Sequence, residues 1–267
     1  MNRKCIVERQ NGTPASSLTS ATAIVIPAYN EARHLENVLR ACFAIEPLFM
    51  VVVDDASTDE TPNVMAGLKR EYGPRLLSIR NNKNLGKQGS VKRGLAAVVP
   101  FALDAVVLID GDGQHLPAEL PRLVSLLADF DMVIGARSHD EMPVHRRFSN
   151  WLVNTAFHLI GGVNFIDLQS GLRVYRKDLA DRLAVGLGDD GGYGLEHESM
   201  TLLIQQARAR GEVLRVAVAA ASCRYGVAES WIGPLEVMQL AYQTVYQGIK
   251  FRDALEKGPA SVVMGGA

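Results

Sequence analysis

Two aspartates separated by one glycine have the clearest capacity for chemistry in this chain. Asp110 and Asp112 follow the apolar residues 106–109, a short run that is typical of a buried strand. In extended backbone, residues i and i+2 point to the same side, so the two carboxylates can converge on one point. Such a pair suits a hard divalent cation, Mg²⁺ or Mn²⁺, whose other ligands come from phosphate and water. A polar turn after a strand is the alternative, and the D-x-D pattern by itself does not decide between them.

Composition places the chain among ordinary globular proteins. Of its 267 residues, 48% are hydrophobic and 21% are charged, with a formal net charge of −1. This near-zero charge gives no basic field for nucleic acid. Cys5, Cys42 and Cys223 lack metal or disulfide spacing and predict thiols in a reducing compartment. Because no apolar stretch reaches the roughly 20 residues of a bilayer span, we expect a cytoplasmic protein that is at most peripheral at the inner face of a membrane.

Apolar runs alternate with amphipathic segments along the first half of the chain. Helices are expected to separate strands at 23–27, 49–53, 75–80, 106–109 and 132–137. This alternation predicts an α/β fold, with a mainly parallel sheet covered by helices on both faces. Ligands of such sheets gather outside the carboxyl ends of the strands. The residues expected at those ends favour the metal and phosphate interpretation: Tyr29, Glu31, Asp54, Asp55, Asp110, Asp112 and Arg137.

The second half is less regular. Helical spacing of apolar residues spans 145–160, and a polar turn at 167–171 precedes a short strand at 172–175. A helix at 195–210 and a strand at 213–221 follow.

Seven motifs occur in a fixed order along this pattern. They are Pro-Ala-Tyr-Asn-Glu at 27–31, Val-Asp-Asp-Ala-Ser-Thr-Asp at 53–59, Asn-Leu-Gly-Lys at 84–87, Asp-Gly-Asp-Gly-Gln-His at 110–115, Gly-Ala-Arg at 135–137, Asp-Leu-Gln-Ser-Gly-Leu-Arg at 167–173 and Arg-Tyr-Gly at 224–226. With them the chain resembles family 2 glycosyltransferases of the GT-A fold over about residues 23–230. Within that family it is most similar to the polyprenol-phosphate group, typified by the dolichol-phosphate mannosyltransferases.

The resemblance implies a Rossmann-like GT-A domain that transfers a sugar, with inversion, from a GDP- or UDP-sugar to a dolichyl or undecaprenyl phosphate. It implies that Asp110, Asp112 and Gln114 bind Mg²⁺ or Mn²⁺, and that Asp110, Asp112, Asp167 and Arg137 serve catalysis. The implied nucleotide-sugar site comprises Pro27, Ala28, Tyr29, Glu31, Asp54, Asp55, Lys87, Asp110, Gly111, Asp112 and Arg224. For Lys87, a solvated loop position is the alternative.

The expected acceptor site comprises Arg137, which by the resemblance faces a phosphate group, together with Arg146, Arg147 and Ser170. If a helix begins near Arg146 and Arg147, the two cations lie where the helix dipole disfavours them, and a bound anion would remove the conflict. A solvated basic loop is the alternative. A lipid monophosphate has a second pKa of about 6, so it needs positioning by cations more than a general base. The apolar face that follows could contact a membrane surface or pack in the core.

These interpretations define the expected organisation of the chain. We expect a flexible leader over 1–22, a GT-A domain over 23–227 with a nucleotide-sugar half (23–115) and an acceptor half (116–227), an amphipathic helix over 228–255 and a frayed tail over 256–267. A separate membrane-anchoring subunit is a further expected partner. Trp231 stands where the dolichol enzymes carry a lysine, which leaves that phosphate contact open. The absence of a Gln-x-x-Arg-Trp signature argues against polymer synthesis.

Other roles stay open at this point. A hydroxyl acceptor would require a general base, and Glu196, Glu198 or Asp167 could supply one. Carboxylates at a helix start also serve the helix dipole alone, and Asp167 could be a turn residue. His115 could contact phosphate or lie in a surface loop. A nucleotide-sugar-binding subunit without activity is a further interpretation, which the joint presence of Asp110, Asp112 and Gln114 disfavours.

Overall fold

The computed structural model describes residues 18, 21–137, 151, 154–155, 159, 167–188, 194–224, 242, 245–246, 248–253 and 262–266. In this part of the chain the strands are β1 (Thr22–Ala28), β2 (Phe49–Asp54), β3 (Leu76–Arg80), β4 (Ala105–Leu108), β5 (Met132–Arg137), β6 (Arg173–Arg176), β7 (Leu214–Ala221) and β8 (Val262–Gly266). The α-helices are α1 (Leu35–Phe43), α2 (Thr61–Tyr72), α3 (Gly86–Val98), α4 (Leu120–Ser125), α6 (Lys177–Gly186) and α7 (Leu195–Ala209). Short 3₁₀ turns lie at Gly73–Arg75, Pro117–Glu119 and Leu126–Ala128.

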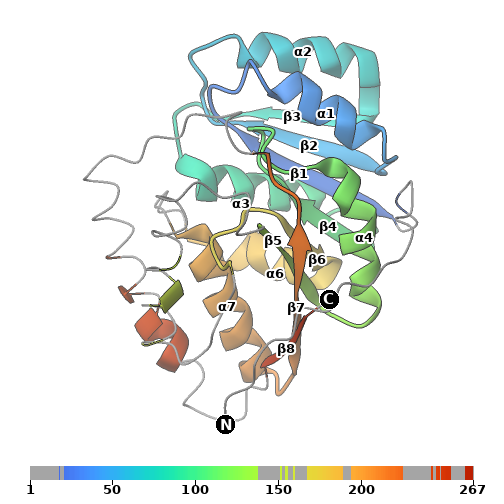
Figure 1. Ribbon diagram of the computed structural model, residues 1–267. Helices are drawn as coiled ribbons and strands as arrows, with labels where there is room; N and C mark the ends of the chain where they lie inside the picture. The colour runs from blue at the N-terminus through green and yellow to red at the C-terminus, as the bar shows by residue number, and fades with distance from the viewer. Residues whose placement is uncertain are drawn as a thin grey trace.

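The strands form one eight-stranded sheet in the order β3-β2-β1-β4-β6-β5-β7-β8 (Figure 1). All neighbouring pairs are parallel except those of β6, which runs antiparallel to both β4 and β5. The chain builds β1, β2 and β3 in one direction and then returns to place β4 on the other side of β1. A crevice for ligands is expected at such a reversal, outside the carboxyl ends of β1 and β4.

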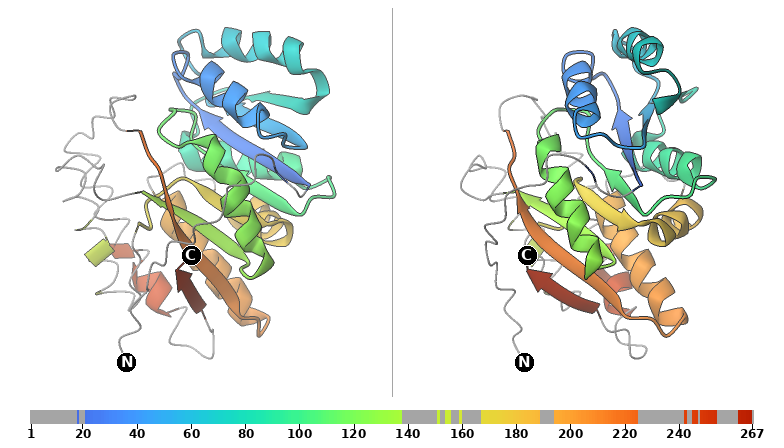
Figure 2. Two further views of the ribbon diagram at one scale, coloured as in Figure 1. Left: turned by 45° about the vertical axis from the view of Figure 1, so that its right-hand side comes forward. Right: turned by 90° about the vertical axis from the view of Figure 1, so that its right-hand side faces the viewer.

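Two hydrophobic cores lie on opposite faces of the sheet. Helices α3, α6 and α7 pack on one face, and α1, α2 and α4 pack on the other (Figure 2). Successive strand residues enter different cores, as Val25 and Ile26 do, because side chains alternate across a strand. Burial on both faces explains why the strands are continuously apolar in sequence.

The reversed strand β6 matters most for the site. Its first residue, Arg173, pairs with Leu108 at the end of β4 and with Ile134 near the end of β5. An antiparallel strand begins where its neighbours end. The turn at 167–172 is therefore held at the same edge as the residues that follow β4 and β5.

The predicted α/β fold with a mainly parallel sheet is confirmed, and the differences lie at single elements. Helix α6 was not among the expected elements, and β6 is reversed. The expected frayed tail is wrong over 262–266, because β8 pairs with β7 and so satisfies the backbone groups of that strand's outer side. Within the predicted helices, residues 151, 154–155, 159, 242, 245–246 and 248–253 are helical, and the rest of those two segments lies outside the described residues. No helix in the described ranges is long and apolar enough to cross a membrane.

Candidate active site

A groove opens outside the carboxyl ends of β1, β2 and β4, where the sheet topology predicts a ligand. Its lining consists of Pro27, Ala28, Tyr29, Glu31, Asp55, Lys87, Ser90, Asp110, Gly111 and Asp112. The groove has a volume of about 260 Å³. A neighbouring pocket beneath Lys87 measures only about 10 Å³, which is room for about one water molecule. Of these two, the groove has space for a ligand, and its lining contains most of the predicted nucleotide-sugar residues.

Negative charge dominates the groove, which is lined by four carboxylates and one ammonium group. Burial, followed by repulsion from Asp112, Asp110 and Asp59, raises the pKa of Glu31 to about 7. An acidic groove that contains a carboxyl group with a pKa of about 7 is a favourable environment for a cation.

Asp55 is fixed in this groove by neighbouring elements. Its Oδ1 accepts hydrogen bonds from Nδ2 of Asn81 at 2.6 Å and from the backbone N–H of Leu85 at 2.8 Å. Asn81 also donates to Oγ of Ser90 on α3 at 2.9 Å. The carboxylate is thus held rigidly between β2, the residue after β3 and the start of α3.

Asp54 does not line the groove, which corrects the prediction that it belongs to the nucleotide-sugar site. The side chain is buried, its Oδ1 accepts the backbone N–H of Ser57 at 2.9 Å, and Oδ2 lies 2.8 Å from Nη1 of Arg80. Adjacent residues at the end of a strand point in opposite directions, so only one of Asp54 and Asp55 can face the ligand.

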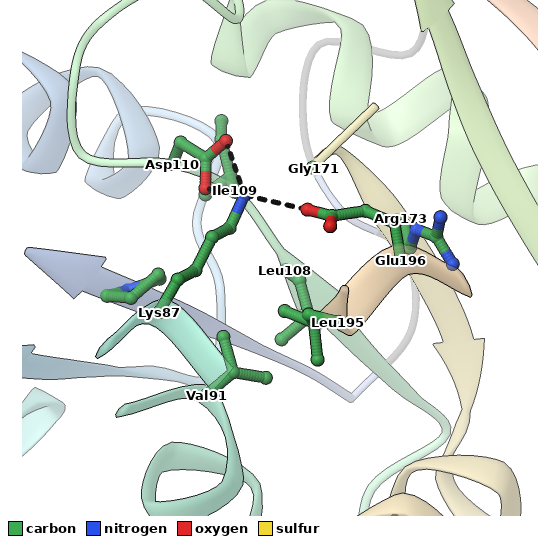
Figure 3. A pocket seen from close by; sticks show the side chains of 10 residues that line it. Lys87, Val91, Leu108, Ile109, Asp110, Gly171, Arg173, Leu195 and Glu196 are labelled. Atoms are coloured by element: carbon green, nitrogen blue, oxygen red, sulfur yellow. Dashed lines mark hydrogen bonds and ion pairs between the residues drawn. The ribbon is translucent and has the colours of Figure 1, made fainter. Parts of the chain in front are cut away.

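Lys87 is the cation that bridges the groove to the second half of the chain (Figure 3). Its Nζ lies 2.8 Å from Oδ1 and 3.0 Å from Oδ2 of Asp110, and 3.0 Å from Oε1 of Glu196. Burial disfavours the charged forms of Lys87, Asp110 and Glu196, but the ion pairs among them outweigh this effect. They raise the pKa of Lys87 and, with Arg173 acting on Glu196, lower the pKa values of Asp110 and Glu196. Lys87 therefore lies in α3 as the partner of two carboxylates, although its side chain is 37% exposed.

The turn that precedes β6 closes over this ion pair. Asp167 accepts Nε of Arg137 at 2.8 Å, Nη2 of Arg137 at 2.9 Å and the backbone N–H of Arg137 at 3.0 Å. Ser170 is fully buried and donates from Oγ to the carbonyl oxygen of Gly135 at 2.5 Å. This burial disagrees with the predicted contact between Ser170 and an acceptor phosphate, because the hydroxyl is already used inside the fold.

The loop after β4 is tied to the end of β7. The backbone N–H of Gln114 donates to Oδ1 of Asp112 at 2.9 Å, and the carbonyl oxygen of Gln114 accepts the backbone N–H of Arg224 at 2.7 Å. His115 and Cys223 form an isolated antiparallel bridge. His115 is buried rather than in a surface loop, and burial lowers its pKa to about 4. Arg224, which is exposed, thereby lies beside the predicted metal-binding loop.

Comparison with known proteins identifies the family of this fold and groove. The model for glycosyl transferase family 2 matches residues 23–184, which is more than half of the chain. The chain belongs to this family.

Relatives of this family 2 glycosyltransferase come from archaea and bacteria. An uncharacterized protein of Methanocaldococcus jannaschii is 29% identical over 237 residues, covering 83% of this chain and 96% of that protein. The undecaprenyl-phosphate 4-deoxy-4-formamido-L-arabinose transferase of Pseudomonas fluorescens is 33% identical over 168 residues, covering 60% of this chain and 48% of the relative. The chain therefore matches about half the length of that transferase.

A solved structure confirms the GT-A-like fold of this family 2 glycosyltransferase. Glucosyl-3-phosphoglycerate synthase from Mycobacterium tuberculosis, in complex with Mn²⁺, uridine diphosphate and phosphoglyceric acid, matches with a TM-score of 0.58. The sequences are 21% identical, and the match covers 86% of this chain and 79% of the synthase. Similarity at this level of identity concerns the fold alone.

The groove of this family 2 glycosyltransferase fits a divalent cation only in part by itself. Asp110 and Asp112 line the groove, and their carboxylates are hard oxygen donors that would suit such an ion. Among the described residues, no group of three His, Cys, Asp or Glu side chains gathers closely enough to hold a metal ion. Such a donor set fits Mg²⁺ or Mn²⁺ that shares its coordination with a diphosphate and water. The predicted participation of Gln114 stays a prediction.

Two residues of this site were not predicted from the sequence, or were given another role. Arg173 is almost fully buried and donates to the carbonyl oxygens of Ser170 at 3.1 Å and Leu168 at 2.6 Å, and to Oγ of Ser199 at 3.1 Å. An arginine inside an apolar strand signals such a set of partners. Glu196, proposed from the sequence as a base, is instead the partner of Lys87.

Three predicted residues remain, namely Glu198, Arg146 and Arg147. Glu198 accepts the backbone N–H of Gly188 at 3.0 Å and Nε2 of Gln88 at 3.1 Å, so both of its oxygens hold the fold together. Arg146 and Arg147 lie outside the described residues.

Proposed function

We propose that this family 2 glycosyltransferase moves a sugar, with inversion at the anomeric carbon, from a nucleoside diphosphate sugar to a polyprenyl phosphate. The observation that carries this proposal is the acidic groove at the topological switch point, where Asp110 and Asp112 share the lining with a rigidly held Asp55. An acidic wall with room for a ligand suits a pyrophosphate that arrives together with a divalent cation.

The donor is proposed to lie along this groove. Asp55 offers a fixed hydrogen-bond acceptor, and the half-exposed ring of Tyr29 offers a surface for a base or ribose. Asp110 and Asp112 hold Mg²⁺ or Mn²⁺ with the diphosphate. When bound, the ion stabilises the negative charge that develops on the departing nucleoside diphosphate. Whether the base is guanine or uracil is an outcome of the assay below.

The acceptor is proposed to be a polyprenyl phosphate, such as undecaprenyl phosphate. The bacterial relative carries that acceptor in its name. Arg224 is held beside Gln114 and provides an exposed cation next to the donor groove. Arg146 and Arg147 are proposed as further phosphate contacts. Because the polyprenyl chain resides in a bilayer, we propose that the protein works at the membrane surface, with or without a membrane-anchoring subunit.

A hydroxyl acceptor is the competing possibility, and the contacts of the candidate bases count against it. Glu196 pairs with Lys87, and this pairing lowers the pKa of Glu196 and so reduces its strength as a base. The oxygens of Glu198 and Asp167 accept hydrogen bonds inside the fold. A phosphate nucleophile avoids this difficulty, because it is already ionised at neutral pH.

The test supplies the purified protein with a panel of UDP- and GDP-sugars, Mg²⁺ or Mn²⁺, and one acceptor at a time. The acceptors are undecaprenyl phosphate, undecaprenol and 3-phosphoglycerate. We expect an acid-labile glycolipid with undecaprenyl phosphate only. A glycoside of 3-phosphoglycerate or of undecaprenol, without the glycolipid, would show that the acceptor is a hydroxyl group. Binding of donor without any transfer would favour a subunit without activity.

A further inference from the structure

Lys87 occupies an unusual position for a cation. It lies in the first turn of α3, where the helix dipole favours negative charge. Its ammonium group is held there by two carboxylates from distant parts of the chain, Asp110 after β4 and Glu196 at the start of α7. The two carboxylates differ in location, because Asp110 lines the donor groove and Glu196 lines only the small pocket beneath it.

Asp110 has two competing partners if the proposed donor site is correct. Both of its oxygens lie within 3.0 Å of Nζ of Lys87. A divalent ion bound to Asp110 would face this ammonium group at close range, so the ammonium group must yield its contact with Asp110. Glu196 remains as its partner on the side away from the groove.

The turn before β6 lies against one side of the ammonium group. A Cβ atom at position 171 would overlap both Asp110 and Lys87, so the turn before β6 lies directly against the pair. Helix α7 carries Glu196. Arg173 links the turn to this helix by donating hydrogen bonds to Ser170 in the turn and to Ser199 in α7. The turn and Glu196 are therefore parts of one wall, and this wall holds the ammonium group between Asp110 and Glu196.

We propose that Lys87 is the resting counter-ion of the donor site, and that Glu196 is a positioning residue that retains the Lys87 ammonium group when a divalent ion takes Asp110. This inference rests on the proposed donor site and adds a competition between an internal cation and the ion. The metal affinity of the protein is then set partly by Glu196, which does not touch the ion.

The test measures Mn²⁺ binding to the full chain with and without UDP or GDP, from the electron paramagnetic resonance signal of free Mn²⁺, after subtraction of the Mn²⁺ that the nucleotide binds in a titration without protein. Lys87→Met removes the competitor and should tighten Mn²⁺ binding by about tenfold, as expected for one nearby charge partly screened by solvent. Glu196→Gln leaves the ammonium group on Asp110 and should weaken binding by a similar factor. Lys83→Met is the matched control, because it removes one exposed positive charge from the loop before α3 and should leave Mn²⁺ affinity nearly unchanged.

The double variant Lys87→Met/Glu196→Gln separates positioning from simple attraction. If Glu196 acts through Lys87, adding Glu196→Gln to Lys87→Met should change affinity by about twofold or less. An undiminished effect would show that Glu196 attracts the ion directly and would overturn the inference. Unchanged or weaker binding in Lys87→Met would overturn it as well. Failure of the unaltered protein to bind Mn²⁺, with or without UDP or GDP, would instead contradict the proposed donor site.

Discussion

At the donor groove, four carboxylates line the wall beside one ammonium group, whereas at the adjacent turn Asp167 is matched by Arg137. The excess of negative charge in the groove affects Glu31, whose pKa is raised to about 7 by burial and by neighbouring carboxylates. At the turn, both oxygens of Asp167 accept hydrogen bonds from one guanidinium group. Negative charge is thus concentrated in one region and compensated in the other.

This difference separates charges that serve a ligand from charges that serve the fold. An excess of like charge in a groove is unfavourable until a cation binds, so it is expected where a ligand completes the structure. A bidentate pair between β5 and the turn before β6 instead fixes two segments relative to one another. We propose that the predicted catalytic residues divide in this way, with Asp110 and Asp112 serving the ligand and with Asp167 and Arg137 serving the fold.

The largest effect is expected for Asp112→Ala. Removing one proposed ligand should lower turnover by on the order of 10²–10³-fold, as the loss of a group that stabilises transition-state charge does. The fold should persist, because the substitution relieves repulsion in the groove. Transfer assays and circular dichroism check the two statements. Unaffected turnover would show that the ion is bound elsewhere.

An effect of similar size, on stability rather than on turnover, is expected for Arg137→Met. It leaves the buried carboxylate of Asp167 without its cation, which costs about 3–5 kcal/mol for such pairs. Adding Asp167→Asn should recover much of the loss, as denaturant unfolding would reveal. Arg40→Met, which removes an exposed ion pair with Glu71, is the control and should have little effect. If Arg137→Met lost activity but kept its stability, Arg137 and Asp167 would serve ligand binding rather than the fold.

A smaller effect on catalysis is expected for Gly171→Ala, because the added methyl group overlaps Asp110 and Lys87. The neighbouring side chains must shift, and we expect turnover to fall by about tenfold, in line with the cost of overpacking. Gly67→Ala is the matched control, since its added Cβ meets nothing within 4 Å and lies inside α2. Equal kinetics for the two variants would show that the turn does not position the ion pair.

The smallest expected effect is a pH dependence of stability from Glu31. Its pKa in the folded protein is about 7, against an ordinary value of 4.5. Between these values the folded state binds the proton and the unfolded chain does not, so stability should fall as pH rises from about 4.5 to 7. Glu31→Gln removes this slope. Melting temperatures are measured with a chelator present. The difference between the variant and the unaltered protein should grow in favour of the variant from about pH 4.5 to 7 and should stay constant above pH 7.

The sequence predicts which residues lie at the carboxyl ends of the strands because the signals there are local. A buried strand followed by acidic residues places those residues at its carboxyl end, and this holds for Asp55 and Asp110. Period-two alternation also says that Asp54 and Asp55 face opposite sides, but it does not say which of them faces the groove. That choice depends on the neighbouring strands.

The remaining features depend on contacts between distant positions. Lys87 and Glu196 are separated by 109 positions, and no local pattern pairs them. A cation in the first turn of α3 and an arginine inside β6 are the signals that something must compensate each. The reversal of β6 is equally hidden, since a four-residue strand carries no information on its direction. β8 forms because an outer strand accepts another segment, whatever its sequence distance.

The Arg137–Asp167 clasp has a consequence for how the chain can diverge. Its two residues fix the points where the polypeptide leaves β5 and approaches β6, and both points lie at the ligand edge. The clasp therefore sets the spacing of these two strand ends independently of the length of chain between them, since lengthening a closed connection costs little conformational entropy. An insertion between the two residues is expected to leave the sheet and the groove in place.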